Sequence, residues 1–582
     1  MALFKNTAYT KEEAVKWPMP NYWDAVAFCL IFAGLIWLAW SARQMTMPFH
    51  MGQSIPISLD PRNLPSYALR TVLRMFIGLF FSLIFTFTFG TWAGKSKRAA
   101  CIIIPIIDIL QSVPVLSFLT ITVTAFIALF SGSMLGPECA AIFAIFTAQV
   151  WNMTLSFYQS VRTVPHDLRE ASRIFHLSAW QRFWRIDVPF AMPGLLWNVM
   201  MSMSGSWFFV TASEAFSVAN QQITLPGVGS YIALAILHAN KHALLYAILT
   251  MLAVILLYDQ LLFRPLSHWV QRFKFDSVED VTIDEAWVVK LFQRTLFLNR
   301  FGVVFESLGE NIVNLPFLNR QKAVQKKKLL TDKQSSLMLI LGRVLLGLIL
   351  IVGLGFIVNY IFTELRWNEV RHLLLLGGFT GLRVMSLIII SSLIWVPVGV
   401  WIGSRPGVAT VIQPIVQFLA AFPANLAFPV IALLIVRFNL NVEIWASPLM
   451  VLGTQWYILF NVIAGTTALP KDLKQATATF GVRGFLRWKR LILPGIFPYF
   501  LTGAITAAGG AWNASILAEA VSWGSRSLHA TGLGAYISEA SSRGDFNQVV
   551  FGTIIMCIFV VVINRLIWRP LYNLAAEKFT LR

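Results

Sequence analysis

The chain has 582 residues, of which 57% are apolar and 13% are charged, and its formal net charge is +19. This composition excludes an ordinary soluble protein and indicates a polytopic membrane protein. In a soluble protein such a charge would suggest nucleic-acid binding, but here most Lys and Arg residues fall on one side of the predicted topology, as cytosolic loops require. The four cysteines show neither metal-ligand nor disulfide spacing, so they predict no metal site.

Long apolar runs, taken in chain order, predict the membrane spans. No cleavage-site pattern precedes the first run, which therefore predicts an uncleaved span. Lys95, Lys97 and Arg98 place the end of the second span in the cytosol. The expected spans are 24–42, 70–94, 99–130, 139–161, 190–213 and 243–264, followed by 335–361, 375–403, 409–436, 443–465, 495–518 and 546–568.

The second half of the chain repeats the first. The polar segment Pro165–Pro189 recurs without a gap as Pro470–Pro494, which is a displacement of 305 positions (470 minus 165). In the earlier spans the displacement is 309, since Pro114 recurs as Pro423. Each half is expected to contain six spans and to begin in the cytosol, so the two halves form a parallel repeat.

These patterns predict an all-α polytopic fold with about 12 transmembrane helices. The expected division is a first half at 1–265, a cytosolic linker at 266–334 and a second half at 335–582. The linker is expected to be a tether with a helix that lies along the membrane surface or along a cytosolic partner.

Each copy of the repeated polar segment predicts a short amphipathic helix on the cytosolic side. Pro and Asp suit its first turn, where a missing N–H has no cost and negative charge meets the positive end of the helix dipole. An unpartnered basic loop would also be polar, but two copies that keep the apolar spacing favour a helix presented to a partner. The apolar residues of its face are Leu168, Ala171 and Phe175 in the first copy and Leu473, Ala476 and Phe480 in the second.

Prolines and polar residues within the spans are candidates for a substrate pathway. Pro114 and Pro423 lie midway along a span, where each frees a backbone carbonyl that protein or a water-filled cavity must satisfy. The alternative is a kink that only shapes packing. The other candidates of this kind are Asp108, Gln111, Ser112, Trp207, Asn425 and Trp512.

Charged residues near the external ends of the spans also recur. Arg74 and Glu214 have the counterparts Arg383 and Glu519. Such residues are candidates for function in a membrane, but an Arg–Glu pair that holds two helices together within each half is the simpler interpretation. Asp108 has no acidic counterpart, so it either contacts substrate or bonds to a neighbouring helix.

The pattern E-A-S-x3-H-x9-I-x-V-P at Glu170–Pro189 resembles the EAA loop of binding-protein-dependent ABC importer permeases. Gln475–Pro494 resembles it again, and the flanks resemble the nitrate/taurine/sulfonate class. His176 replaces the usual Gly, although His tolerates positive φ better than most residues, and Gln475 replaces the usual Glu. The residues that the resemblance assigns to ATPase coupling are Asp167, Leu168, Glu170, Ala171, Phe175 and His176, with Asp472, Leu473, Gln475, Ala476, Phe480 and Gly481.

The resemblance implies a fused permease with the type I ABC importer fold, located in a bacterial inner membrane with both termini in the cytosol. It implies two ATPase subunits on the cytosolic side, a substrate-binding protein outside, and a small organic or inorganic anion such as a sulfonate, taurine, nitrate or bicarbonate as substrate. The chain has no phosphate-binding loop, so ATP and Mg are expected on the ATPase subunits, and no cofactor is expected here. The alternative is an ion-coupled secondary transporter or channel that uses Asp108 and the paired Glu residues.

Overall fold

The computed structural model describes residues 56–218, 221–270, 367–524 and 526–578, together with single positions elsewhere. The expected spans at 24–42 and 335–361 and almost all of the linker lie outside these ranges. Within the described part, six helices are long and apolar enough to cross a membrane, or eight if each of two bent helix pairs is one span. The chain is therefore an all-α polytopic membrane protein, as its composition predicts.

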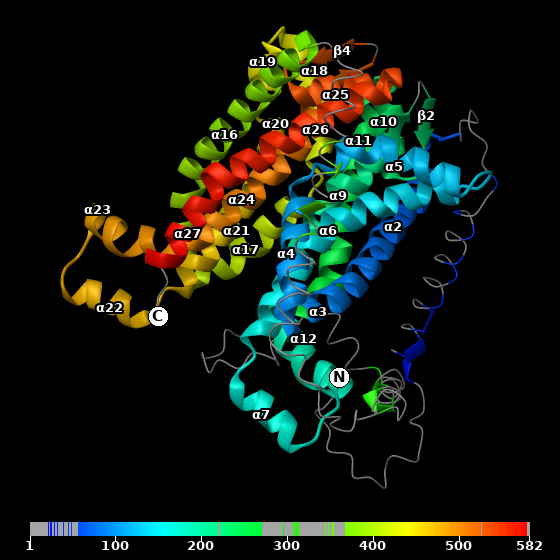
Figure 1. Cartoon of the computed structure of the whole chain (residues 1–582). Coiled ribbons are helices and arrows are strands. Elements are labelled where there is room, and N and C mark those ends of the chain that lie inside the picture. The colour runs from blue at the N-terminus through cyan, green and yellow to red at the C-terminus, as the bar shows by residue number, and fades with distance from the viewer. Residues whose placement is uncertain are drawn as a thin grey trace.

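The first half, blue to green in Figure 1, consists of long helices with one short hairpin. Its elements are η2 (Pro61–Asn63), α2 (Leu64–Phe85), η3 (Thr86–Gly90), α3 (Thr91–Lys95), α4 (Lys97–Ser112), α5 (Val115–Leu129), α6 (Leu135–Thr163), α7 (His166–Ile174), α8 (Ala179–Arg182), η4 (Phe183–Asp187), α9 (Val188–Ser213), β1 (Ala215–Val218), β2 (Gln221–Thr224), α10 (Val228–Leu237), α11 (Lys241–Tyr258), η5 (Asp259–Phe263) and α12 (Arg264–Val270).

The second half, yellow-green to red in Figure 1, follows the same order. Its elements are α16 (Trp367–Gly403), α17 (Pro406–Ala421), η7 (Ala424–Leu426), α18 (Phe428–Phe438), α19 (Val442–Trp445), α20 (Leu449–Leu452), α21 (Gln455–Ala468), α22 (Lys471–Thr479), α23 (Gly484–Arg487), η8 (Trp488–Ile492), α24 (Leu493–Ala518), β3 (Ala520–Trp523), β4 (Arg526–His529), α25 (Leu533–Arg543), α26 (Phe546–Ile563), η9 (Asn564–Trp568) and α27 (Arg569–Lys578).

The predicted break in the third span of each half is present. Pro105 lies inside α4 without ending it, whereas Pro114 separates α4 from α5. Pro423 likewise ends α17, and the helix axis turns by 71° between Ile415–Ala421 and Ala424–Phe438. A proline at the start of a new helix leaves no backbone donor unpaired, which explains why the break falls there.

Two features depart from the sequence-based expectation. The predicted span at 443–465 is a bent pair, since Val442–Leu452 and Gln455–Ala468 meet at 44°, whereas its counterpart α6 is one helix. The segments after α9 and α24, for which the sequence pattern predicts no span, each form an antiparallel hairpin, β1–β2 and β3–β4, followed by a short helix. Four-residue strands are too short to give a clear alternation of apolar residues, so the pattern did not show them.

The two halves pack against each other through several pairs of helices. Helix α5 contacts α24 and α26 of the second half, and α17 contacts α9 and α11 of the first. At one end of the bundle α25 contacts β1 and α10 contacts β3, so each hairpin reaches the opposite half. Figure 1 shows these hairpins at one end of the molecule and α7 and α22 at the other, on the two sides of the bundle.

Candidate coupling helices and pathway residues

Helices α7 and α22 are the two short helices that the repeated polar segments predict. Each begins after a proline, Pro165 or Pro470, and has an aspartate in its first turn. Each ends through a left-handed residue, His176 with φ 49° and Gly481 with φ 65°. His176 thus has the left-handed backbone conformation that Gly481 has in the second copy.

The same hydrogen bond closes both helix ends. The Leu177 N–H donates to the Ser172 carbonyl at 3.0 Å, and the Val482 N–H donates to the Thr477 carbonyl at 2.9 Å. This bond, from the third residue past each helix to its last turn, pairs a carbonyl that a helix end would otherwise leave free. The two helices therefore have matching ends although one uses His and the other Gly.

The apolar tips of both helices are exposed. Phe175 is 74% exposed and Phe480 is 82% exposed. The acidic and amide residues of the predicted coupling set are also exposed, whereas Leu168, Ala171 and Ala476 are half-buried. An exposed ring at the same place in both copies is the arrangement expected of an apolar contact with a partner.

Basic side chains fix both helices to the helix that precedes them. Arg169 Nη2 donates to the Val161 carbonyl at 3.0 Å, and Lys474 Nζ donates to the Thr466 carbonyl at 3.1 Å. Burial, with Arg487 nearby, lowers the pKa of Lys474. Sequence reasoning missed this anchor, although Arg169 and Lys474 are themselves 305 positions apart and both basic.

The first coupling helix has two further contacts. His166 Nδ1 lies 3.3 Å from Glu170 Oε1, four residues along the same helix. After the turn, Gln181 Nε2 and Arg185 Nη2 donate to Asn314 Oδ1 at 3.3 and 3.2 Å. Asn314 falls within 266–334, the segment that the sequence predicts to be a linker, so this residue contacts the first polar segment.

The predicted Arg–Glu pair is present in the first half as part of a larger buried cluster. Arg74 Nη1 donates to Glu214 Oε1 at 2.7 Å, and Arg74 also binds both oxygens of Glu138 at 2.6 and 2.7 Å. The Thr71 hydroxyl and the Gly229 N–H donate to Glu214, each at 2.7 Å. The cluster joins α2, α6 and the end of α9, and its charged side chains are almost completely buried.

The second half contains the equivalent cluster. Arg383 Nη1 donates to Glu519 Oε1 at 3.0 Å, and Arg383 also pairs with Glu443. Thr380 and Gly534 donate to Glu519 at 2.8 and 2.7 Å. The sequence analysis missed the third member of each cluster, Glu138 and Glu443. These two residues are equivalent at a displacement of 305, but they lie in the region where the displacement between the halves changes from 309 to 305, so their equivalence was not recognised.

At the breaks in the third spans, the two halves exchange hydrogen bonds. The Val115 N–H, which follows Pro114, donates to Asn513 Oδ1 of the second half at 2.6 Å. Asn425, two residues after Pro423, donates from Nδ2 to the Thr211 hydroxyl of the first half at 2.8 Å. Each break is thus joined to the opposite half by one side-chain hydrogen bond.

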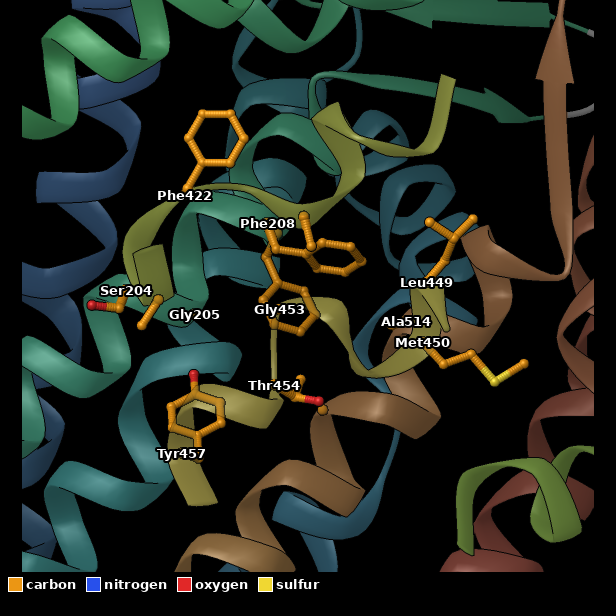
Figure 2. A pocket seen from close by; sticks show the side chains of 14 residues that line it. Ser204, Gly205, Phe208, Phe422, Leu449, Met450, Gly453, Thr454, Tyr457 and Ala514 are labelled. Carbon is orange, nitrogen blue, oxygen red and sulfur yellow. The ribbon is translucent and has the colours of Figure 1, made fainter. Parts of the chain in front are cut away.

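A pocket lies between the halves, where α9 faces α17, α20, α21 and α24. The volume of this cavity is about 60 Å³. Figure 2 shows Ser204 and Gly205 of α9 opposite Tyr457, and Phe208 and Phe422 nearby. Gly205 permits the close approach, since a Cβ there would meet the Tyr457 hydroxyl at 2.6 Å.

The other predicted pathway residues are distributed unevenly. Phe422 and Ala424, on either side of Pro423, line the pocket, whereas no neighbour of Pro114 does. Trp207 and Trp512 are buried in their own halves, where Trp207 packs against Tyr258 and Trp512 packs against Phe559. Gln111 is half-buried, and the side chains of Asp108 and Ser112 lie outside the described part. A role of these residues in a pathway stays a prediction.

The structure is that of a polytopic membrane protein with an internal duplication. Its two equivalent helical halves each present a short exposed helix at the same end of the bundle. A family model, binding-protein-dependent transport system inner membrane component, matches residues 86–264 and again residues 395–567. The chain belongs to this family and contains two copies of its domain.

Relatives match parts of the chain. The nitrate import permease protein NrtB of Synechocystis sp. is 26% identical over 170 residues, which are 28% of this chain and 59% of the relative. The glycine betaine/proline betaine transport system permease protein ProW of Escherichia coli is 29% identical over 28% of this chain and 44% of its own length. The bicarbonate transport system permease protein CmpB of Synechococcus elongatus is 25% identical over 32% and 63%. The chain thus spans about half the length of these relatives.

Proposed function

We propose that this chain is the complete membrane pathway of an ABC importer, with both permease halves in one polypeptide. The observation that carries the proposal is the pair of exposed helices α7 and α22, with Phe175 and Phe480 at equivalent tips. Two separate ATPase subunits, which hold the ATP and Mg, would each receive one of these helices. Burial of a large apolar side chain contributes about 1.5–3 kcal/mol to the free energy of association. Burial of the Phe175 and Phe480 rings would therefore stabilise the complex with the ATPase subunits measurably.

The further parts of the proposal follow from family membership. A substrate-binding protein would dock at the end of the bundle that carries the two hairpins, opposite α7 and α22. The membrane would be a bacterial inner membrane, with the linker at 266–334, the termini and both coupling helices in the cytosol. The permease halves would be 1–265 and 335–582, with the first and seventh spans at 24–42 and 335–361.

The substrate would be a small anion. Two of the relatives described above are named for nitrate and bicarbonate, and a third is named for betaines. Sulfonates and taurine, like nitrate and bicarbonate, are small solutes that carry an oxyanion group. The chain itself would carry out no hydrolysis and hold no cofactor.

The test is release of the ATPase by charge at the two helix tips. Replacing Phe175 and Phe480 together by Asp is expected to dissociate the ATPase subunits from the detergent-solubilised complex, because each carboxylate would have to be buried without a partner. Co-purification of the chain with its ATPase measures this. Phe438→Asp is the matched control, since Phe438 is 62% exposed and lies at the end of α18, away from α7 and α22. An intact complex in the double variant would contradict the proposal and favour an ion-coupled transporter.

A further inference from the structure

The segment that joins the second coupling helix to α24 carries an excess of positive charge. Its exposed cations are Arg483, Arg487, Lys489 and Arg490. No acidic residue occurs between Asp472 and Glu519. In the part of the chain that the structure describes, no carboxylate pairs with any of these four cations. Residues 483–490, here called the basic junction, thus present positive charge that the protein leaves uncompensated.

Large apolar side chains lie among these cations and are also exposed. Phe485 is 81% exposed and Leu486 is 51% exposed. Figure 1 shows α22 and α23 on the outer side of the bundle, so both side chains face the surroundings rather than a neighbouring helix. An exposed aromatic ring and a leucine among several Lys and Arg residues are typical of segments that lie at a membrane surface.

The length of the helix places the basic junction at the level of the lipid headgroups. Elements α23, η8 and α24 follow one another without a break and form an apolar helix of 35 residues, Gly484–Ala518. At about 1.5 Å per residue this helix is about 52 Å long, whereas the hydrocarbon core of a membrane is about 30 Å thick. Because Arg487, Lys489 and Arg490 are costly to place in hydrocarbon, the surplus length lies at their end.

In the first copy the corresponding segment is held by protein contacts. Ser178 and Gln181 form a capping box at the start of α8. Lys95 Nζ, at the end of α3, lies 2.6 Å from Asp187 Oδ2. The Trp180 ring packs against the neighbouring rings of η4. The first segment is therefore fixed to its own half without a lipid.

The second copy has lost each of these contacts. The positions equivalent to Ser178 and Gln181 are Arg483 and Leu486, and α23 has no side-chain cap. Asp187 corresponds to Ile492, which cannot form an ion pair. The substitutions exchange internal contacts for exposed cations and exposed apolar side chains, as expected of a segment whose partner lies outside the chain.

We propose that the basic junction binds the headgroups of anionic phospholipids, such as phosphatidylglycerol, in the leaflet on the side of the coupling helices. The lipid phosphates pair with the four cations, and Phe485 and Leu486 enter the layer beneath the headgroups. A cluster of four or more Lys and Arg residues beside a membrane span has this preference, and each cation contributes up to about fivefold. The lipid would then fix the second coupling segment where protein fixes the first. The proposal goes beyond the proposed function and does not depend on the ATPase.

Fluorescence quenching by brominated lipids tests the proposal on the purified full chain in nanodiscs, without ATPase. Leu486→Cys carries a bimane label, in a chain in which Ser replaces Cys29, Cys101, Cys139 and Cys557. The nanodiscs contain phosphatidylcholine and phosphatidylglycerol, and either one or the other lipid has brominated chains. Bromine quenches bimane only at close range, so the two series give the relative affinity of the junction for each lipid.

Brominated phosphatidylglycerol is expected to quench the label more strongly than brominated phosphatidylcholine at the same mole fraction. The preference is expected to weaken at high salt, because salt screens the attraction between exposed charges. Adding Arg483→Gln and Lys489→Gln is expected to lower the preference by about fivefold or more, since two cations are lost. Arg182→Gln with Arg185→Gln, in the equivalent segment of the first copy, is the matched control that leaves it unchanged.

Equal quenching by the two lipids would overturn the proposal, and so would quenching by neither, which would place the junction in water. An equal loss of preference in the first-copy control would also overturn it, because the effect would then be one of total charge. If bound ATPase shields the label from both lipids, the junction belongs to the ATPase contact instead. If the cysteine-free chain does not fold, photoreactive phosphatidylglycerol is cross-linked to the unmodified chain, and absence of cross-links at 483–490 by mass spectrometry would contradict the proposal.

Discussion

The arginine clusters of the two halves have the same connections but different exposure to water. In the first half Arg74 and Glu214 are 0% exposed and Glu138 is 3% exposed. In the second half Arg383 is 15% exposed and its partner Glu443 is 42% exposed. Duplication therefore preserved which helices are joined, while the surroundings of each copy changed. The same ion pair is expected to have a different energetic role in each half, because the cost of an unpaired charge depends on burial.

The largest expected effect is loss of the buried arginine. Arg74→Ala leaves Glu138 and Glu214 without their cation, and removal of one partner from a buried pair lowers the free energy of unfolding by about 3–5 kcal/mol. Arg383→Ala is expected to cost less, since water reaches Glu443. The measurement is the midpoint of thermal unfolding in one detergent, with the exposed Arg62→Ala as control. Equal losses for Arg74→Ala and Arg383→Ala would show that burial does not distinguish the clusters.

An intermediate effect is expected at the helix breaks, where the halves again differ. Asn513→Ala leaves the Val115 N–H without its acceptor, which costs about 1–3 kcal/mol of unfolding free energy. Asn425→Ala is expected to cost less, because the Thr211 hydroxyl still donates to the Trp207 carbonyl at 2.9 Å.

Thermal unfolding checks the ranking of the two asparagine variants, and hydrogen exchange at Val115 checks its cause. Asn513→Asp keeps a carbonyl-type acceptor and is the matched control, expected to preserve protection of the Val115 amide. A faster exchange in Asn513→Asp than in Asn513→Ala would contradict the assignment of Oδ1 as the acceptor.

The smallest expected effect concerns the ends of the coupling helices. Gly481→His places a side chain at φ 65°, which costs about 1 kcal/mol, and His176→Gly relieves a similar strain at φ 49°. Exchange of the α22 amides is expected to become faster in the first variant, and exchange of the α7 amides slower in the second. Unchanged amide exchange in both variants would mean that the conformation of residues 176 and 481 does not limit local opening of α7 and α22.

Several features of the candidate site were predictable because they are encoded locally. The repeat of Pro165–Pro189 at Pro470–Pro494 is recognisable from the amino-acid sequence alone. Each copy contains a short helix with an exposed phenylalanine at its end. Pro114 and Pro423 interrupt their spans because proline cannot continue the backbone hydrogen bonding of a helix. The pairing of Arg74 with Glu214 was predictable since isolated charges near a membrane need a partner.

Other features depend on which helices meet. Glu138 joins the Arg74 cluster only because α6 packs against α2, and the Asn513 side chain reaches Val115 only because α24 of one half contacts α5 of the other. The hairpins, the bend before Gln455 and the aromatic pocket at Phe208 and Tyr457 likewise arise between segments far apart in the chain. By itself, the sequence determined the helical class, the duplication and the two exposed coupling helices, since hydrophobic length, proline and periodicity act over a few residues. Only the tertiary structure decided the buried clusters and the pocket, because burial and partner geometry are set by packing between helices.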